Sequence, residues 1–225
     1  MPIISINPTT GNPLQAYDEM TPGQVSAAIQ DAATAWQDWR ASSFAERARL
    51  LRATATILRE RKDELARLMA LEMGKPLKQG VAEAEKCAWV CEYYADHGER
   101  HLAADVIATD ATRSYVAFQP LGVVLAVMPW NFPLWQVYRF AAPALMAGNA
   151  GLLKHASNVP GCALVIEEIF QRAGAPQGLF RTLMIGSGQV KGVIEHPLVR
   201  AVTLTGSTPA GRAVAGQAGA VLKKT

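Results

Sequence analysis

The sequence predicts an α/β fold in which a parallel sheet is flanked by helices. Two observations support this class. Short apolar runs rich in Val and Leu alternate with segments of helical length through the second half of the chain. Within that half, the segment from Leu121 to Lys154 reads as a strand, a tight turn, a helix and a second strand, which together form one βαβ unit of a parallel sheet.

Four helices are expected before the sheet. Residues 1–20 read as an extended lead-in with turns. Capping boxes at Thr21–Gln24 and Ser43–Glu46 open the first two helices, and Gly74 with a following proline ends the third. A fourth is expected over residues 79–97. All four carry charged residues on one side and Ala and Leu on the other, so we interpret them as surface helices that pack on a sheet.

After these helices, residues 106–119 contain two β-prone pieces separated by polar residues, which predicts a hairpin that projects from the body. Residues 221–225 look like the approach to a further strand, so we expect the sequence to be a fragment of a larger domain. Between these segments strands and helices alternate, with strands at 121–128, before 154, at 179–185 and at 201–205, and helices that end near Gly148, Gly174, His196 and Ala220.

The 22 basic and 19 acidic residues give a formal net charge of +3 and are interspersed, so we expect no nucleic-acid-binding face. The N-terminus lacks the features of a signal peptide and no apolar run reaches membrane-spanning length, which predicts a cytoplasmic protein without a membrane partner. Three cysteines and four histidines lack metal-ligand spacing, so no metal site is expected. Cys87 and Cys91 stand one helical turn apart and are interpreted as a buried, unreactive pair.

Asn131 follows the first strand of the βαβ unit and stands between Pro129 and Pro133. The two prolines restrict the backbone, so the strand end presents an uncharged amide in a fixed place. An amide N–H there can donate a hydrogen bond to a developing oxyanion. A structural asparagine that turns the chain into the helix explains the same pattern equally well.

Two glycine turns also follow strands. Gly206 would let the backbone approach a phosphate, which the Ser207 hydroxyl and the free N–H groups of the following helix can bind. Gly186 and Gly188 form a weaker turn of the same kind. Neither has the G-x-G-x-x-G spacing, and each taken alone is also explained as a simple turn. Two such turns, together with Lys154 at a third strand end, favour nucleotide binding.

The segments MPWNFP, AGNAGLLKHAS and VTLTGSTPAG, in this order, resemble the aldehyde dehydrogenase superfamily over the whole chain. Residues 133–161 most resemble bacterial succinate-semialdehyde dehydrogenase-like members. The resemblance implies the N-terminal portion of such an enzyme. It would comprise a helical part at 1–105, an oligomerisation-type hairpin at 106–119 that could join two copies, and a Rossmann-like dinucleotide-binding sheet at 120–225.

The resemblance also implies roles for individual residues. In the family, the asparagine that corresponds to Asn131 donates to the oxyanion of the thiohemiacetal. The family's lysine at the position of Lys154 bonds the adenosine ribose, and its Gly-Ser pair meets the pyrophosphate. The cofactor-binding residues implied are Pro129, Trp130, Lys154, Ser157, Gly186, Gly206 and Ser207.

Ser157 bears on the choice between NAD and NADP. Many NAD-preferring members have a glutamate at this position, whose carboxylate would repel a 2′-phosphate. At ~4 Å and an effective dielectric constant near 20, that repulsion is roughly 4 kcal/mol. Because Ser157 removes it and offers a hydrogen-bond donor, we expect the intact fold to accept NADP, with NAD as the other candidate cofactor.

Trp135 and Arg139 lie four residues apart and therefore share one face of the helix that follows Pro133. Arg139 matches a position at which succinate-semialdehyde-type members carry an arginine, and a guanidinium suits a substrate carboxylate. A surface or interdomain ion pair is the alternative. The reaction implied is NAD(P)-dependent oxidation of a short acidic aldehyde, such as succinate semialdehyde, to the carboxylic acid.

The family mechanism also needs a cysteine nucleophile and a glutamate base. Neither motif is found in residues 1–225, and Cys162 lies on a predicted helix outside any such motif. We therefore expect the catalytic domain to be absent and the chain to be inactive by itself. The alternatives are a non-catalytic dinucleotide-binding or subunit-interaction fragment, and a gene remnant that does not fold stably.

Overall fold

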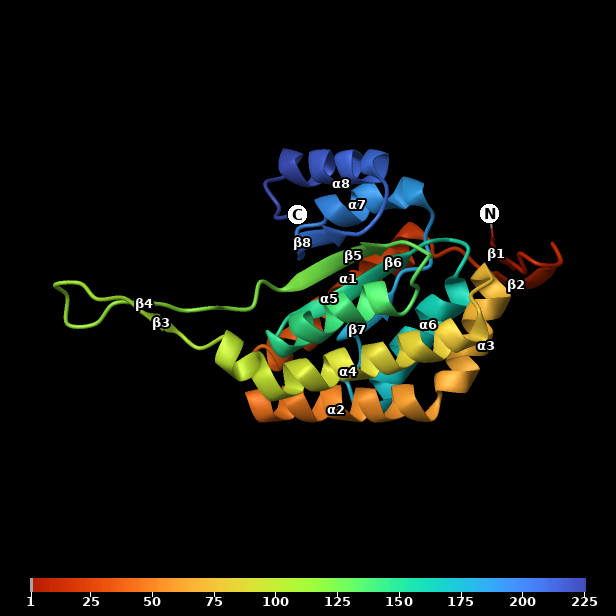
Figure 1. Cartoon of the computed structure of the whole chain (residues 1–225). Coiled ribbons are helices and arrows are strands. Elements are labelled where there is room, and N and C mark those ends of the chain that lie inside the picture. The colour runs from red at the N-terminus through yellow and green to blue at the C-terminus, as the bar shows by residue number, and fades with distance from the viewer. Residues whose placement is uncertain (1) are drawn as a thin grey trace.

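A computed structural model describes residues 2–225 and contains a central sheet of four strands (Figure 1). The strands lie in the order β7 (Phe180–Thr182), β6 (Ala150–His155), β5 (Val123–Met128) and β8 (Val199–Leu204), and every neighbouring pair is parallel. β5 and β6 are buried along almost their whole length, which explains why their sequences are continuously apolar. The α/β prediction is confirmed.

Helices cover both faces of this sheet (Figure 1). α5 (Trp135–Met146) and α6 (Pro160–Arg172) pack on one face, and α1 (Pro22–Trp39) and the short α7 (Val190–Glu195) pack on the other. α8 (Thr208–Ala220) follows β8 and packs beside α7. The sheet is thus the middle layer of three, as expected for a βαβ alternation.

The interpretation that all four N-terminal helices pack on the sheet is wrong for three of them. Only α1 does so. α2 (Phe44–Glu60), α3 (Lys62–Met73) and α4 (Leu77–His101) pack on one another and on α5 and α6, where they form a second helical layer. The physical reason is that α5 and α6 already cover that face of the sheet, so the apolar sides of α2–α4 are buried against helices instead.

The ends of these helices follow local chemistry. Thr21 and Ser43 each form the predicted capping box with the residue three positions later. Gly74 ends α3 in the left-handed conformation with φ of 75°. α4 extends beyond the expected residues 79–97 at both ends. α3 and α4 approach closely at Gly80, where a Cβ atom would lie 2.8 Å from the Cα of Ala66.

Two antiparallel hairpins lie outside the central sheet. The expected lead-in is the hairpin of β1 (Ile3–Ile6) and β2 (Pro13–Tyr17), and β1 packs against α3 and α6. β3 (Asp105–Val106) and β4 (Tyr115–Val116) form the second, which projects far from the body (Figure 1). The predicted projecting hairpin is confirmed.

The last third of the chain differs from expectation mainly at β7, which is shorter than the predicted 179–185. Beyond it, the backbone of Met184 accepts a hydrogen bond from the Met20 N–H, so the segment turns toward the N-terminal part instead of extending the strand. A 3-10 turn at Ser187–Gln189 leads into α7. After α8, Lys224 forms a parallel bridge with Ala201, which places the last residues beside β8.

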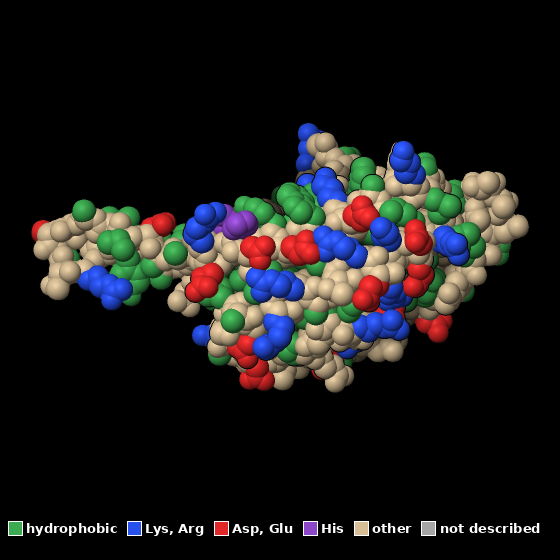
Figure 2. Space-filling model, turned by 60° about the horizontal axis from the view of Figure 1, so that its bottom comes forward, with side chains coloured by type: hydrophobic (Ala, Val, Ile, Leu, Met, Phe, Trp, Pro, Cys, Tyr) green, Lys and Arg blue, Asp and Glu red, His purple; other side chains and the backbone are tan. Residues whose placement is uncertain are grey.

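The outer face formed by α2, α3 and α4 carries acidic and basic side chains in alternation (Figure 2). Several are paired between α2 or α3 and α4, including Arg52 with Asp96, Arg59 with Glu92 and Lys62 with Glu85. This face therefore has no continuous patch of one sign. Across residues 2–225, no helix combines the length and the apolar character that crossing a membrane requires.

Candidate functional site

The predicted site residues meet at one edge of the sheet. Asn131, Lys154, Gly186 and Ser207 lie at or just after the carboxyl ends of β5, β6, β7 and β8, and these ends share one edge because the strands are parallel. β6 and β7 extend the sheet to one side of β5, whereas β8 lies on its other side. Such a reversal of strand order opens a crevice at the carboxyl edge in which α/β proteins bind ligands.

Asn131 lies in the turn between β5 and α5. Its side chain is exposed and makes no hydrogen bond within residues 2–225, so the amide is available to a ligand. Its neighbours Trp130 and Phe132 are 49% and 46% exposed. Pro129 is partly buried, and Pro133 and Leu134 are buried. The turn thus presents its central amide to solvent and is anchored where it enters α5.

His155, the last residue of β6, fixes this turn from the side of the sheet. Its Nδ1 accepts the N–H of Ala156 at 2.9 Å, so its Nε2 carries the proton and donates to the carbonyl oxygen of Pro133 at 2.9 Å. Burial lowers the pKa of His155 to about 4, so the ring is neutral at pH 7. No pattern in the sequence indicates this role.

This histidine predicts a loss of stability in acid. An unfolded histidine titrates near pH 6.5, so between about pH 6.5 and 4 the unfolded chain binds a proton that the folded chain does not. The free energy of unfolding should therefore decrease by up to about 3 kcal/mol as the pH falls through this window. Urea unfolding at several pH values measures it. His155→Gln keeps a donor for Pro133 and should remove this part of the slope; an unchanged slope would contradict the assignment.

Lys154 stands directly before His155 and in register with Val127 of β5. It is partly buried, and burial lowers the pKa of its ammonium group. No carboxylate pairs with it among the residues that the structure describes. A partly desolvated cation without an ion-pair partner is suited to donate hydrogen bonds to a ligand at the sheet edge. Ser157, three residues later, is exposed at the same edge.

Gly186 has a structural role that the sequence did not reveal. Its N–H donates to Oε1 of Glu19 at 2.5 Å, and a Cβ atom here would lie 2.7 Å from that oxygen. This hydrogen bond is the main reason why the pKa of Glu19 is lowered. A side chain at position 186 would therefore displace the contact that joins the end of β7 to the N-terminal segment.

Gly206 and Ser207 lie at the exposed N-terminus of α8. The Ser207 Oγ accepts the N–H of Ala210 at 3.4 Å and so acts as the N-cap of the helix. At Gly206 a Cβ would make only ordinary contacts, the nearest at 3.6 Å. The serine is thus partly used by the fold, and the helix N-terminus remains open to an anion.

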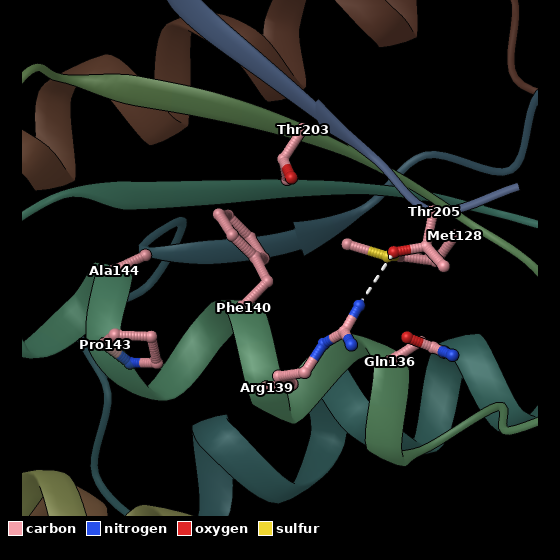
Figure 3. Close-up of a pocket in the computed structure, with 8 residues that line it drawn as sticks. All are labelled: Met128, Gln136, Arg139, Phe140, Pro143, Ala144, Thr203 and Thr205. Carbon is pink, nitrogen blue, oxygen red and sulfur yellow. Dashed lines mark hydrogen bonds between the residues drawn. The ribbon is translucent and has the colours of Figure 1, made fainter. Parts of the chain in front are cut away.

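A cleft of about 380 Å³ lies between α5 and the ends of β5 and β8 (Figure 3). Arg139 extends from α5 toward the sheet, where its Nη2 donates to the Thr205 Oγ1 at 3.1 Å. Gln136 lies beside it, and its buried Oε1 has no hydrogen-bond partner within residues 2–225. The remaining lining residues are Met128, Phe140, Pro143, Ala144 and Thr203.

Trp135 lies outside this lining, although it shares the helix with Arg139. Its indole ring packs beneath the Lys86 ammonium of α4, whose Nζ lies 4.0 Å from the ring centroid. Gln136 and Thr205 were not predicted. The three-residue spacing of Gln136 and Arg139 could have indicated that they share a face, but nothing local relates either to Thr205.

The three cysteine thiols of this chain are inaccessible to a substrate. Cys87, Cys91 and Cys162 are fully buried and unpaired. Burial is the main cause that raises the pKa of each well above the usual value. The prediction that Cys87 and Cys91 are buried is confirmed.

Comparison with known proteins agrees with the motifs. Residues 1–225 match the aldehyde dehydrogenase family. A probable NADP(+) succinate-semialdehyde dehydrogenase of Synechocystis is 54% identical over the whole chain, which covers 50% of that protein. A succinate-semialdehyde dehydrogenase [NADP(+)] 1 of Mycobacterium tuberculosis is 52% identical, also with 50% of its length covered.

The structural comparison gives the same result. The crystal structure of a succinic semialdehyde dehydrogenase of Streptococcus pyogenes in complex with NADP+ superposes with a TM-score of 0.96 at 38% identity, covering 99% of this chain and 49% of that one. The chain spans about half the length of the curated relatives it matches. With a family match over all 225 residues, the chain belongs to the aldehyde dehydrogenase family.

Proposed function

We propose that this chain supplies the cofactor-binding edge and the oxyanion donor for NADP-dependent oxidation of a short acidic aldehyde, such as succinate semialdehyde, to the carboxylic acid. The observation that carries the proposal is the arrangement of Asn131, Lys154 and Ser207 along one edge of the parallel sheet. The names of the relatives, which are NADP(+) succinate-semialdehyde dehydrogenases, support the cofactor and the substrate class.

The residues present fit a dinucleotide phosphate. Lys154 is an ammonium without a carboxylate partner in the described chain, and Ser157 adds no negative charge beside it. The N-terminus of α8 at Ser207 offers a favourable environment for the pyrophosphate. Gly186, and the backbone near Pro129 and Trp130, would contact the adenine and nicotinamide ends. When bound, the cofactor accepts the hydride that the aldehyde carbon loses.

Asn131 would act on the aldehyde oxygen. This oxygen gains negative charge when a nucleophile adds to the carbonyl carbon, and a fixed amide N–H that donates to it stabilises the charge without transferring a proton. The exposed, unbonded amide is suited to this. Arg139 would bind the distant carboxylate of the substrate in the cleft beside α5. Trp135 packs under Lys86 outside this cleft, so it would make no contact with the substrate there.

NADP binding to the 225-residue chain tests the cofactor assignment. We expect NADP to quench the fluorescence of the tryptophans, one of which is the half-exposed Trp130. Lys154→Ala should weaken binding of both cofactors by about tenfold, because it removes one hydrogen bond from a charged group. Ser157→Glu should weaken NADP by roughly tenfold to a hundredfold, since solvent screens the repulsion, and should affect NAD little. Equal losses for both cofactors in Ser157→Glu would contradict the role of this position.

Replacement of Arg139 tests the substrate class. In a chain completed with the second half of the Synechocystis relative, Arg139→Leu should reduce kcat/KM for succinate semialdehyde by about a hundredfold, mostly through KM, because a charge-assisted pair is lost. The same variant should alter kcat/KM for butanal by less than about threefold. Arg139→Lys, which keeps the charge without the two-pronged geometry, should lie between them. A similar loss for both aldehydes would rule out a carboxylate-binding role.

A non-catalytic role in dinucleotide binding or subunit interaction is the second candidate. Burial of all three thiols favours it for this chain taken alone. The projecting hairpin, with Val106 80% exposed and Tyr115 and Val116 half exposed, offers apolar surface for another copy. We propose that the hairpin makes such a contact. Light scattering would test it: Val106→Asp should shift an oligomer toward monomer.

A further inference from the structure

Apolar side chains hold the turn that presents Asn131 only where it enters α5, at the buried Pro133 and Leu134. Trp130 and Phe132, on either side of Asn131, are both about half exposed, so the hydrophobic core does not fix this part of the chain. α5 begins directly after the turn, and its N-cap residue Leu134 provides no side-chain cap. Beyond that anchor, the position of the turn depends on polar contacts from other elements.

Glu83 on α4 supplies one of these contacts. Its Oε1 accepts the N–H groups of Leu134 and Trp135, both at 2.9 Å. These N–H groups belong to the first turn of α5 and have no partner within the helix. A carboxylate at this position also interacts favourably with the positive end of the helix dipole. Glu83 is thus an N-cap supplied from another helix, 51 residues earlier in the chain.

Lys75 completes the arrangement. Its ammonium forms an ion pair with Oε2 of Glu83, and the two side chains are only 4% and 2% exposed. The same Nζ lies 3.8 Å from the centroid of the Phe132 ring, which is the residue after Asn131. Lys75 therefore both neutralises the buried cap and contacts the turn directly, while His155 holds Pro133 from the sheet.

We propose that Lys75 and Glu83 are positioning residues for Asn131. They fix the start of α5 and the Phe132 ring, and with them the amide that lies between. An oxyanion donor must be held within a few tenths of an ångström of its productive place, so a looser turn lowers kcat more than it changes cofactor binding. The inference rests on the proposed function, in which Asn131 donates to the oxyanion.

Two double variants separate the cap from the buried charge. Lys75→Met with Glu83→Gln removes both charges and keeps an oxygen that accepts the two N–H groups. Lys75→Met with Glu83→Ala also leaves no buried charge but removes the acceptor. Neither pair strands an unpaired ion in the interior, which would itself destabilise the fold. The comparison between them therefore isolates the cap.

Hydrogen exchange on the 225-residue chain is the first readout. In the Ala double variant, the amides of Leu134 and Trp135 should exchange at least tenfold faster than in the Gln double variant, while amides of β5 and β6 exchange at similar rates in both. If Leu134 and Trp135 exchange equally in the two variants, or if every amide accelerates together in the Ala variant, the positioning role is overturned.

Catalysis in the chain completed with the second half of the Synechocystis relative is the second readout. The Ala double variant should lower kcat about tenfold or more relative to the Gln double variant, with KM for NADP changed less than twofold. Asn131→Ala is assayed beside them. If Asn131→Ala lowers kcat but the Ala double variant does not, the positioning inference fails. If Asn131→Ala leaves kcat unchanged, the proposed role of Asn131 fails, and the inference with it.

Discussion

Residues 1–225 alone are expected to oxidise succinate semialdehyde at no measurable rate with NADP or NAD. The reaction needs a nucleophile that adds to the aldehyde carbon, and among side chains of this chain a cysteine thiolate is the candidate. Cys87, Cys91 and Cys162 have no solvent exposure, and burial raises the pKa of each. Loss of a nucleophile in other enzymes costs on the order of a millionfold in kcat, which would place turnover below detection.

Two measurements check this expectation. A coloured thiol reagent should modify none of the three cysteines in the native chain and all three after denaturation, because access requires unfolding. When the aldehyde and NADP or NAD are added, the absorbance of the reduced cofactor should rise no faster than in a sample without protein. NADP binding without turnover would agree with a chain that supplies the cofactor-binding part of an enzyme, and equally with a non-catalytic dinucleotide-binding chain. A native thiol that reacts quickly, or turnover at an enzyme-like rate, would contradict the burial on which the expectation depends.

Much of the sheet could be predicted from the sequence because its physical cause is local. Strands covered on both faces are continuously apolar, as in Val123–Met128, and helix starts such as Thr21 carry their own capping residues. The clustering of Asn131 and Lys154 also followed, since parallel strands bring their carboxyl ends to one edge. What an amphipathic helix packs against is not encoded locally, which is why the interpretation of α2–α4 was wrong.

The supporting contacts of the site could not be predicted for a similar reason. Glu83 and Glu72 lie in helices that carry many other charged residues, and their sequence context is that of surface carboxylates. Their partners are 51 and 89 residues away, so no spacing relates donor to acceptor. The cleft beside Arg139 likewise depends on how α5 packs against β8, which brings Thr205 within 3.1 Å. Such contacts follow from the fold and not from a motif.

Glu72 leads to the largest stability change that we expect from one side chain. It lies in the last turn of α3, where a negative charge interacts unfavourably with the helix dipole. It is nevertheless 3% exposed, because its carboxylate accepts the N–H groups of Gly161 and Cys162 at 2.8 and 2.9 Å and the hydroxyl of Ser5 at 2.9 Å. One carboxylate thus caps α6 and joins it to β1.

Glu72→Ala should therefore lower the free energy of unfolding by about 4 kcal/mol, because it leaves two N–H groups and a hydroxyl without their acceptor. For a chain of this size that corresponds to a decrease in Tm of roughly 10 °C. Glu72→Gln keeps one acceptor oxygen and should cost about half as much. Glu60→Ala, which removes an exposed carboxylate near the end of α2, should change stability by less than about 0.5 kcal/mol. If Glu72→Ala and Glu60→Ala unfold at the same urea concentration, the three hydrogen bonds do not stabilise the junction of β1, α3 and α6.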